Sequence, residues 1–354
     1  MVLAILMLAA CQPAAEPAAS VPQAATAAGT DLSGIRQYLL DRTQALKQST
    51  SALKQETDRY YALAAAAEFD YPRLWQEQQP AVVETINAAR DAWKAASPLY
   101  EQMEAVVAGT PALASYDVIL DAGASGEEDP ANAAPIDLHL PDGRTLARPG
   151  NLFGVTESTL WGAFAAFAAQ GVTADWDGDG AISFGETLPD ANVLKAGADA
   201  LDEQAGALAR AAVDWQPTLP DAFNALVVMT PTMSEYFASW RDSRFVSGDT
   251  STQRDFVAIS RLADMQDILG GLELIYAEVQ PLAATVNADQ AEQVAAGLTD
   301  LRAFVAGVYA DEQGGKRFSP EEADLLGEEA QNRATAVTGH ISQLVAQLGI
   351  TLPE

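Results

Sequence analysis

The sequence contains one cysteine and two histidines among its 354 residues. A single cysteine excludes an intrachain disulfide and a multi-thiolate metal site, and two histidines exclude an imidazole-rich one. Basic residues are also scarce, since 20 lysines and arginines stand against 49 acidic residues, for a formal net charge of −29. Such a chain repels phosphate backbones and anionic membrane surfaces, so we expect no nucleic-acid partner and regard cations as the natural counterpart.

Familiar catalytic signatures are missing too. The chain has no HExxH, no glycine-rich phosphate loop and no GxSxG nucleophile elbow, and its lone cysteine lies at the extreme N-terminus. We therefore assign no catalytic residue from the sequence.

The distribution of apolar residues predicts an all-α fold. Aromatic residues are few and alanine is abundant, which favours closely packed helices. A long amphipathic helix is expected from residue 31, because one apolar stripe recurs at roughly heptad spacing: Ile35, Leu39, Leu46, Leu53 and Tyr60. Further helices are predicted at 80–98, 100–107, 156–169, 193–213, 221–240, 256–279, 288–309 and 320–348. The length suggests two consecutive helical bundles, over 31–170 and 191–354.

One segment breaks the helical pattern. Residues 122–151 are rich in glycine and proline, and Asp142-Gly143 is typical of a tight turn between two short strands. We expect a small β-hairpin inserted into the first bundle.

The N-terminus has the features of an export signal. Residues 1–10 are apolar and end in Leu8-Ala9-Ala10-Cys11, which resembles the lipobox of bacterial lipoproteins. That resemblance implies a signal peptide over 1–10, lipidation of Cys11 and a flexible tether over 11–30. Gln12 after the cysteine resembles the outer-membrane sorting signal, so we expect a lipid-anchored protein on the periplasmic side of the outer membrane.

Residues 171–190 contain a twelve-residue pattern typical of an EF-hand calcium loop. Gly180 stands at the sixth position, where the loop turns sharply. Oxygen ligands fall at positions 1, 3, 5, 7, 9 and 12, with a main-chain carbonyl at the seventh: Asp175, Asp177, Asp179, Ala181, Ser183 and Glu186. We expect Ca²⁺ to bind there in the weak extracellular range of about 10⁻⁴–10⁻³ M. The alternative is a solvated acidic turn.

Several short segments resemble the imelysin-like family, which includes EfeO-type periplasmic iron-uptake proteins, homologues of an insulin-cleaving metallopeptidase and alginate-binding lipoproteins. The matching segments are 89–93 (ARDAW), 100–104 (YEQME), 116–121 (YDVILD), 157–161 (ESTLW), 264–265 (DM) and 271–276 (GLELIY). The resemblance implies an all-helical, two-bundle protein that faces the periplasm.

The chain departs from the family's Gly-x-His-x-x-Glu motif. When Glu157 is placed on the motif's glutamate, Gly154 stands where the histidine belongs. The two histidines, His139 and His340, lie elsewhere and are expected at the surface or in packing. This departure puts both peptidase activity and the family's usual metal site in doubt.

Four carboxylates offer a second candidate site. Glu101 and Glu104 are spaced to share one helix face, and Asp121 and Glu157 join them if the helices cross. An all-oxygen cluster favours hard cations, although these side chains can equally be solvated or cap helices. The tryptophans at helical positions are expected in the core: Trp93, Trp161, Trp215 and Trp240.

The function that we predict is a non-enzymatic, periplasmic binding or accessory lipoprotein in metal, specifically iron, uptake. It would hold Ca²⁺ and a second, unidentified metal ion. Two alternatives stay open: a metal-dependent peptidase of the imelysin type and a polysaccharide-binding lipoprotein.

Overall fold

The computed structural model describes residues 29–353. The proposed signal peptide, Cys11 and residues 12–28 of the tether lie outside this part of the chain. The long helices are α1 (Ser33–Ala66), α2 (Tyr71–Gly109), α5 (Ala191–Asp214), α9 (Arg261–Val286), α10 (Ala288–Gln313) and α11 (Pro320–Leu348). The shorter ones are α3 (Ala114–Asp117), the π-helical turn η1 (Val118–Ala122), α4 (Leu152–Trp161), η2 (Ala165–Phe167), α6 (Leu219–Met229), η3 (Thr230–Thr232), α7 (Met233–Asp242), α8 (Arg244–Ser247) and η4 (Gly248–Thr250). The all-α prediction is confirmed.

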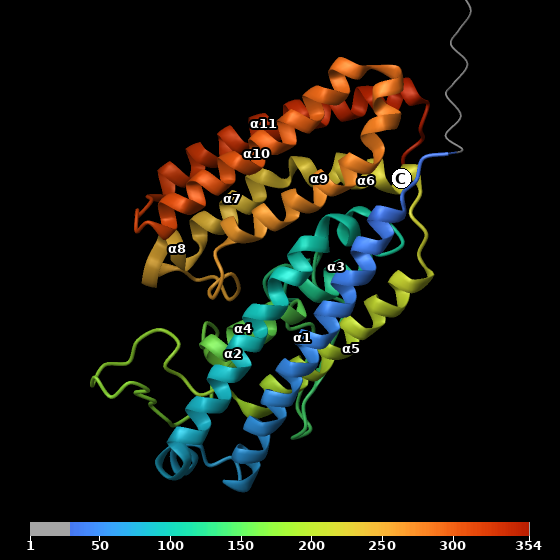
Figure 1. Cartoon of the computed structure of the whole chain (residues 1–354). Coiled ribbons are helices and arrows are strands. Elements are labelled where there is room, and N and C mark those ends of the chain that lie inside the picture. The colour runs from blue at the N-terminus through green and yellow to red at the C-terminus, as the bar shows by residue number, and fades with distance from the viewer. Residues whose placement is uncertain (1–28, 354) are drawn as a thin grey trace, which may run out of the picture.

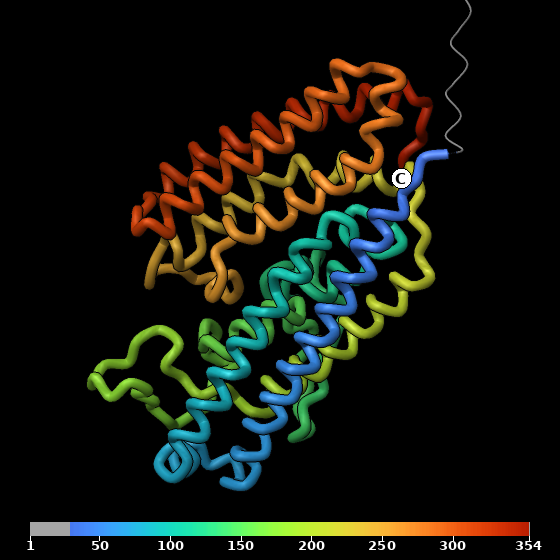
Figure 2. The backbone as a smooth tube through the Cα atoms, in the orientation of Figure 1, coloured from blue at the N-terminus to red at the C-terminus, as the bar shows by residue number. Residues whose placement is uncertain are grey.

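The helices form two bundles that pack on each other (Figure 1). The N-terminal bundle consists of α1, α2, α4 and α5, and the C-terminal bundle consists of α6, α7, α9, α10 and α11. Helices α9 and α6 of the C-terminal bundle both contact α2, so α2 is the main helix of the N-terminal bundle at the interface. The backbone trace in Figure 2 shows the long rods of each bundle running side by side, with the C-terminal bundle in gold to red.

The apolar stripe predicted for the first helix is buried along its whole length. Ile35, Leu39, Leu46, Leu53 and Tyr60 are each at most 2% exposed. They face α2 and α5, the helices against which α1 packs. The heptad spacing therefore identified the buried face of α1 correctly.

The prediction of two helices separated near Pro98 is wrong, because α2 (Tyr71–Gly109) continues through Pro98 and its kink lies at Gln78 instead. Pro80 and Pro98 both lie inside it, and the backbone departs from helical geometry only at Gln78 (φ −131°, ψ 17°). A proline that lacks the N–H and crowds the preceding turn can bend a helix without ending it when packing holds both halves. The continuous helix carries Glu101 and Glu104 on the same rod as Trp93.

Three other predicted helices have different boundaries. α4 begins at Leu152 because the Asn151 side chain accepts the Gly154 N–H, and it ends where Gly162 turns left-handed at φ 68°. The predicted helix 221–240 is divided into α6 and α7 at Pro231. α9 starts at Arg261 rather than at Phe256, whose φ of 51° places it in an irregular loop.

Helix α5 lies in the N-terminal bundle, although the sequence placed it in the second. It packs on α1 and α4, and its buried face includes Leu194, Leu201 and Leu208. The start of the second bundle, expected at residue 191, therefore moves to the connector that follows Asp214. α5 belongs to the N-terminal bundle because its apolar face packs there. The acidic loop that precedes α5 therefore does not mark the boundary between the bundles.

The inserted β-hairpin is present as predicted. Strand β1 (Leu138–His139) pairs antiparallel with β2 (Thr145–Leu146), and Gly143 adopts φ 90° in the turn. In the described residues, no helix is long and apolar enough to cross a membrane.

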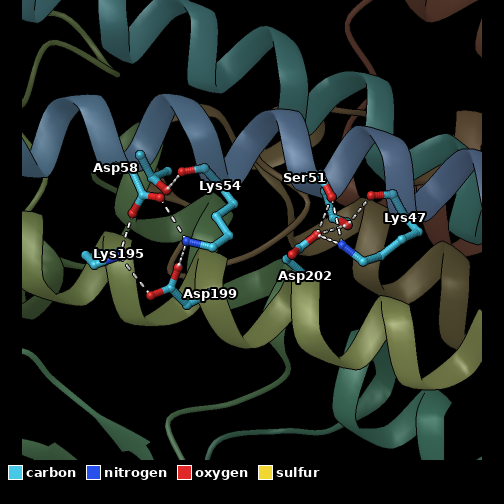
Figure 3. A network of polar contacts seen from close by, with 9 residues as sticks. Lys47, Ser51, Lys54, Asp58, Lys195, Asp199 and Asp202 are labelled. Carbon is cyan, nitrogen blue, oxygen red and sulfur yellow. Dashed lines mark hydrogen bonds and ion pairs between the residues drawn. The ribbon is translucent and has the colours of Figure 1, made fainter.

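Two groups of charged side chains join α1 to α5 at the surface (Figure 3). In one, the Lys54 ammonium lies 2.8 Å from Asp58 and 2.7 Å from Asp199, and Lys195 contacts the same two carboxylates. In the other, Asp202 accepts hydrogen bonds from Lys47, Thr50 and Ser51. These partly solvated pairs fix the register of the two helices, but each contributes little free energy.

We predict that apolar burial outweighs these ion pairs in holding α1 in place. Leu46→Ala should lower the free energy of unfolding by about 2–5 kcal/mol, because it leaves a cavity at a fully buried position. Lys54→Ala should cost less than about 1 kcal/mol, since water screens its partly exposed pairs. Urea unfolding of both variants compares the two effects, and a larger loss for Lys54→Ala would contradict this ranking.

Candidate functional site

A cluster of buried carboxyl groups lies where the two bundles meet. Glu101 and Glu104 lie one helical turn apart on α2, and Asp121 comes from η1. All three are buried, and one oxygen of each lies within 4.8 Å of the others. The structure thus brings together three of the four carboxylates singled out in the sequence, at a spacing that a single cation can bridge.

The position of Asp121 depends on a π-helical turn. The Gly123 N–H donates to the carbonyl of Val118, five residues earlier, at 3.0 Å. A Cβ at residue 123 would lie 2.2 Å from that carbonyl oxygen, so only glycine fits there. Such widened turns are frequently found at functional sites.

Helix α9 contributes a guanidinium group and a further carboxyl group to the cluster. Arg261 Nη1 lies 3.2 Å from Glu101 Oε2 and 3.4 Å from Asp264 Oδ2, and all three side chains are buried. The guanidinium is held between two aromatic rings, 4.4 Å from the ring centre of Tyr236 and 4.3 Å from that of Phe256. Arg261 is thus the cation that the structure places among these carboxyl groups.

Two phenols donate hydrogen bonds into the cluster. Tyr100 donates to Asp117 Oδ1 at 2.7 Å, and Tyr236 donates to Glu104 Oε1 at 2.8 Å. The second oxygen of Glu104 is buried and has no hydrogen-bond partner, and neither has Arg261 Nε. A buried polar atom without a partner is costly, so the unpartnered Glu104 oxygen indicates a position where a ligand belongs.

Burial dominates the electrostatics of the cluster. It raises the pKa of Asp117 and Asp264 to about 7, in each case more than any neighbouring charge does. Burial and the charge of nearby carboxylates also raise the pKa of Glu101 well above its ordinary value, while Arg261 opposes the rise. The cluster therefore binds protons tightly when nothing else neutralises it.

A small enclosed pocket of about 10 Å³ lies beside Glu101, Asp121 and Asp264. That space is close to what one water-sized occupant needs. Asp121, Gly154 and Phe256 also line a larger, open cleft of about 340 Å³ between the bundles. Asp121 is thus the member of the trio that borders both the small pocket and the open cleft.

Glu157, the fourth predicted ligand, lines the small pocket but has a different main contact. Its Oε1 accepts the backbone N–H groups of Val257 and Ala258, at 3.0 and 2.8 Å. The side chain thereby holds the loop that carries Phe256 and leads into Arg261. Burial nevertheless raises the pKa of Glu157 well above its usual range, with these two hydrogen bonds opposing the rise.

Gly154, which the sequence analysis places at the position of the family's histidine, sits close to this loop. A Cβ there would lie 3.0 Å from Asn151 Oδ1 and 3.4 Å from the Cβ of Asp255. The histidines lie elsewhere: His139 contacts Thr145 in the hairpin, and His340 on α11 contacts Gln290. Neither of them lines the pocket or the cleft.

Sequence reasoning missed four members of the site: Asp117, Tyr236, Arg261 and Asp264. Arg261 and Asp264 had a detectable signal, because charged residues three apart at the start of an apolar helix share one face. Tyr236 had none, since only tertiary packing brings α7 beside α2. The four tryptophans expected in the core are buried there.

The predicted calcium loop is closed by its own carboxylates. Oxygens of Asp175, Asp177 and Glu186 lie within 4.8 Å of one another. Glu186 accepts the N–H groups of Trp176 and Ser183, which join the two ends of the loop. These hydrogen bonds lower the pKa of Glu186.

Asp179, another predicted ligand, is not a member of this close carboxylate group, and the predicted ligands Ala181 and Ser183 follow it in the same turn. Asp179 instead accepts the N–H of Ala181 at 2.7 Å. No helix enters the loop directly, because Gly162 ends α4 well before Asp175.

The loop contacts both bundles. Arg90 of α2 donates to the carbonyls of Gly185 and Leu160 and lies 4.3 Å from the Trp176 ring centre. On the other side, the guanidinium of Arg244 on α8 lies 3.5 Å from the ring centre of Phe184. The loop therefore bridges the bundles in space, although it does not separate them in sequence.

A family model described as Peptidase_M75: Imelysin matches residues 35–347. No curated protein matches the chain. The matched range includes every residue of the buried cluster and the whole acidic loop.

We predict that the metal-free protein loses stability as the pH rises from about 4 to about 7. Asp117 and Asp264 have a pKa of about 7 when folded, against 3.8 for an ordinary aspartate, so the folded state binds more protons across this range. Groups whose pKa is lowered, such as Asp58, lose their contribution only as the pH falls below about 4, so that contribution stays nearly constant across this range. Thermal melts at several pH values in the presence of a chelator measure how the melting temperature changes with pH.

Asp264→Asn should flatten this pH dependence, because it replaces one titrating group by a neutral one of the same shape. The exposed Asp249→Asn is the matched control and should leave the slope unchanged. A melting temperature that rises steadily between pH 4 and pH 7 would contradict the attribution of this pH dependence to the raised pKa of Asp117 and Asp264.

Proposed function

The chain belongs to the imelysin family, and on that basis we propose that it is a periplasmic, non-enzymatic protein that binds a metal ion for uptake, with iron as the expected cargo. The observation that carries this proposal is the buried carboxylate trio Glu101, Glu104 and Asp121, in which Glu104 Oε2 has no partner.

The chemistry of the donor set supports a hard cation. Every candidate ligand is an oxygen atom, and oxygen ligands suit hard ions such as Ca²⁺, Mg²⁺, Mn²⁺ or iron. Several carboxylates around one guanidinium leave an excess of negative charge, which a bound cation would neutralise. The open cleft supplies an entry path, as a binding protein needs.

Two alternatives have less support. A peptidase needs a general base and commonly a histidine ligand, whereas both histidines lie away from the cleft and Glu157 is engaged with main-chain N–H groups. A polysaccharide groove is usually lined by aromatic platforms, whereas Trp93, Trp161, Trp215 and Trp240 are buried.

We also propose that the loop from Asp175 to Glu186 binds Ca²⁺, with Asp175, Asp177, Asp179, Ala181, Ser183 and Glu186 as ligands. The order of residues supports this, because each position carries the group that a twelve-residue calcium loop requires. A bound ion would stiffen the segment that Arg90 and Arg244 hold against the two bundles.

The lipobox-like sequence supports a lipid anchor at Cys11 and a location on the periplasmic side of the outer membrane. The tether would then let the two bundles reach into the periplasm.

The first prediction from this proposal concerns the buried trio. Protein stripped with chelator and carrying Glu186→Gln, which disables the acidic loop, should bind one equivalent of a hard cation. In that background Glu104→Gln should weaken binding by at least about 10- to 100-fold, the loss that an outer-shell partner alone causes. Glu273→Gln, which removes a partly exposed carboxylate on α9, is the control and should bind as the wild type does. Calorimetry with Mn²⁺ and ferric nitrilotriacetate measures both affinities, and equal affinity in the two variants would contradict the assignment.

The second prediction concerns calcium. The melting temperature should rise with Ca²⁺, because an ion that binds only the folded state adds about 2.7 kcal/mol at roughly a hundred times its dissociation constant. Mg²⁺ should have a smaller effect, since it prefers a tighter octahedral geometry. Glu186→Gln should remove most of the calcium shift, whereas Glu127→Gln, in a different loop, should retain it. An unchanged melt at millimolar Ca²⁺ would identify the loop as an acidic turn.

The third prediction concerns export. The full-length gene expressed in a Gram-negative host should yield protein in the membrane fraction, and Cys11→Ser should release it. Wild-type protein recovered in the cytoplasm would contradict the lipoprotein assignment.

A further inference from the structure

We propose that Tyr236 supplies a phenolate ligand to the buried site and that the preferred occupant is a trivalent, oxygen-seeking cation. This inference rests on the proposed function, because it concerns the same carboxylate cluster. It adds a ligand from the C-terminal bundle, and it narrows the expected occupant from any hard cation to a trivalent one.

Tyr236 is the phenol that reaches the carboxylate trio. It lies on α7 of the C-terminal bundle, and its hydroxyl donates to Glu104 Oε1 at 2.8 Å. The other oxygen of Glu104 is buried and unpartnered, so the same carboxylate can bind an ion while it stays beside the phenol. Tyr100, the other phenol nearby, donates to Asp117, which is not a member of the trio.

Tyr236 also lies on the path that an ion would take. Its side chain lines the open cleft together with Asp121 and Arg261. Because its hydroxyl also donates to Glu104, Tyr236 lies between the cleft and the carboxylate trio. With ligands on α7, α2 and η1, the bound ion would join the two bundles.

The ionised form of Tyr236 requires a strong positive charge close by. Burial and the adjacent Glu104 raise its pKa well above the ordinary value, although the Arg261 guanidinium on the ring face lowers it. Without a cation the phenol keeps its proton. On binding, the metal–oxygen bond forms as the O–H bond breaks, and the proton leaves to water in the cleft.

The charge of the cluster favours a trivalent ion over a divalent one. A single guanidinium faces five buried carboxyl groups: Glu101, Glu104, Asp117, Asp121 and Asp264. Coulomb attraction grows in proportion to the charge of the ion, and it is least screened where the site is buried. Divalent hard ions are satisfied by carboxylates and water, so they have little need of a phenolate.

The test uses the full-length protein, stripped of metal, with ferric nitrilotriacetate and gallium nitrilotriacetate as probes. Ferric ion should produce a visible phenolate-to-iron charge-transfer band that saturates at one equivalent. Gallium, which is colourless and redox-inert, should produce a tyrosinate difference spectrum in the near ultraviolet. Mn²⁺ and Ca²⁺ should produce neither spectrum.

Tyr236→Phe should abolish both signals and weaken ferric binding by about 10- to 100-fold, at least as much as the loss of an outer-shell partner. Tyr100→Phe is the matched control, since it removes another buried phenol that donates to a carboxylate, and it should keep both signals. The gallium spectrum of the wild-type protein tests the inference even if a variant fails to fold.

The outcomes separate this inference from the proposed function. Ferric ion bound without a charge-transfer band, a band that survives in Tyr236→Phe, or tighter binding of Mn²⁺ than of gallium would overturn the phenolate assignment and leave the cation site standing. Failure of every cation to bind in a protein whose acidic loop is disabled by Glu186→Gln would overturn the proposed function itself.

Discussion

The arrangement of the interface depends on one buried guanidinium among several buried carboxyl groups. Arg261 contacts Glu101 and Asp264 at 3.2 and 3.4 Å, and its guanidinium lies 4.4 and 4.3 Å from the ring centres of Tyr236 and Phe256. These contacts are longer than typical charge-assisted hydrogen bonds, and the charges do not balance. The cluster therefore requires protons or a further cation, and this requirement links the fold to a binding role.

The elements around the cluster serve to hold it together. α2 runs through two prolines and supplies Glu101 and Glu104, while the π-helical turn presents Asp121. Glu157 fixes the loop before α9 through two main-chain hydrogen bonds and so positions Phe256 over Arg261. Here, beside Gly154, its visible contacts are structural, and the carboxylates on α2 and η1 form the close group.

The acidic loop and the buried cluster are two different kinds of candidate cation site. The loop is exposed and its carboxylates are tied by local backbone hydrogen bonds, so its geometry is a property of a short sequence. The cluster draws its groups from both bundles, so its geometry depends on how the bundles pack. Arg90 and Arg244 connect the loop to the two bundles, and an ion bound there would act on the same interface from its edge.

Residue order alone determined the helical class, the buried stripe of α1, the hairpin at Asp142-Gly143 and the acidic loop, because each depends on near neighbours in the chain. Spacing also paired Glu101 with Glu104. It could not show that α2 continues through Pro98, that α5 joins the first bundle, or that Arg261 and Tyr236 enter the cluster. The last two of these features arise from contacts between segments more than a hundred residues apart. Only the packing of apolar faces sets such contacts. The sequence therefore predicted the acidic loop, but it did not predict the full set of residues in the buried site.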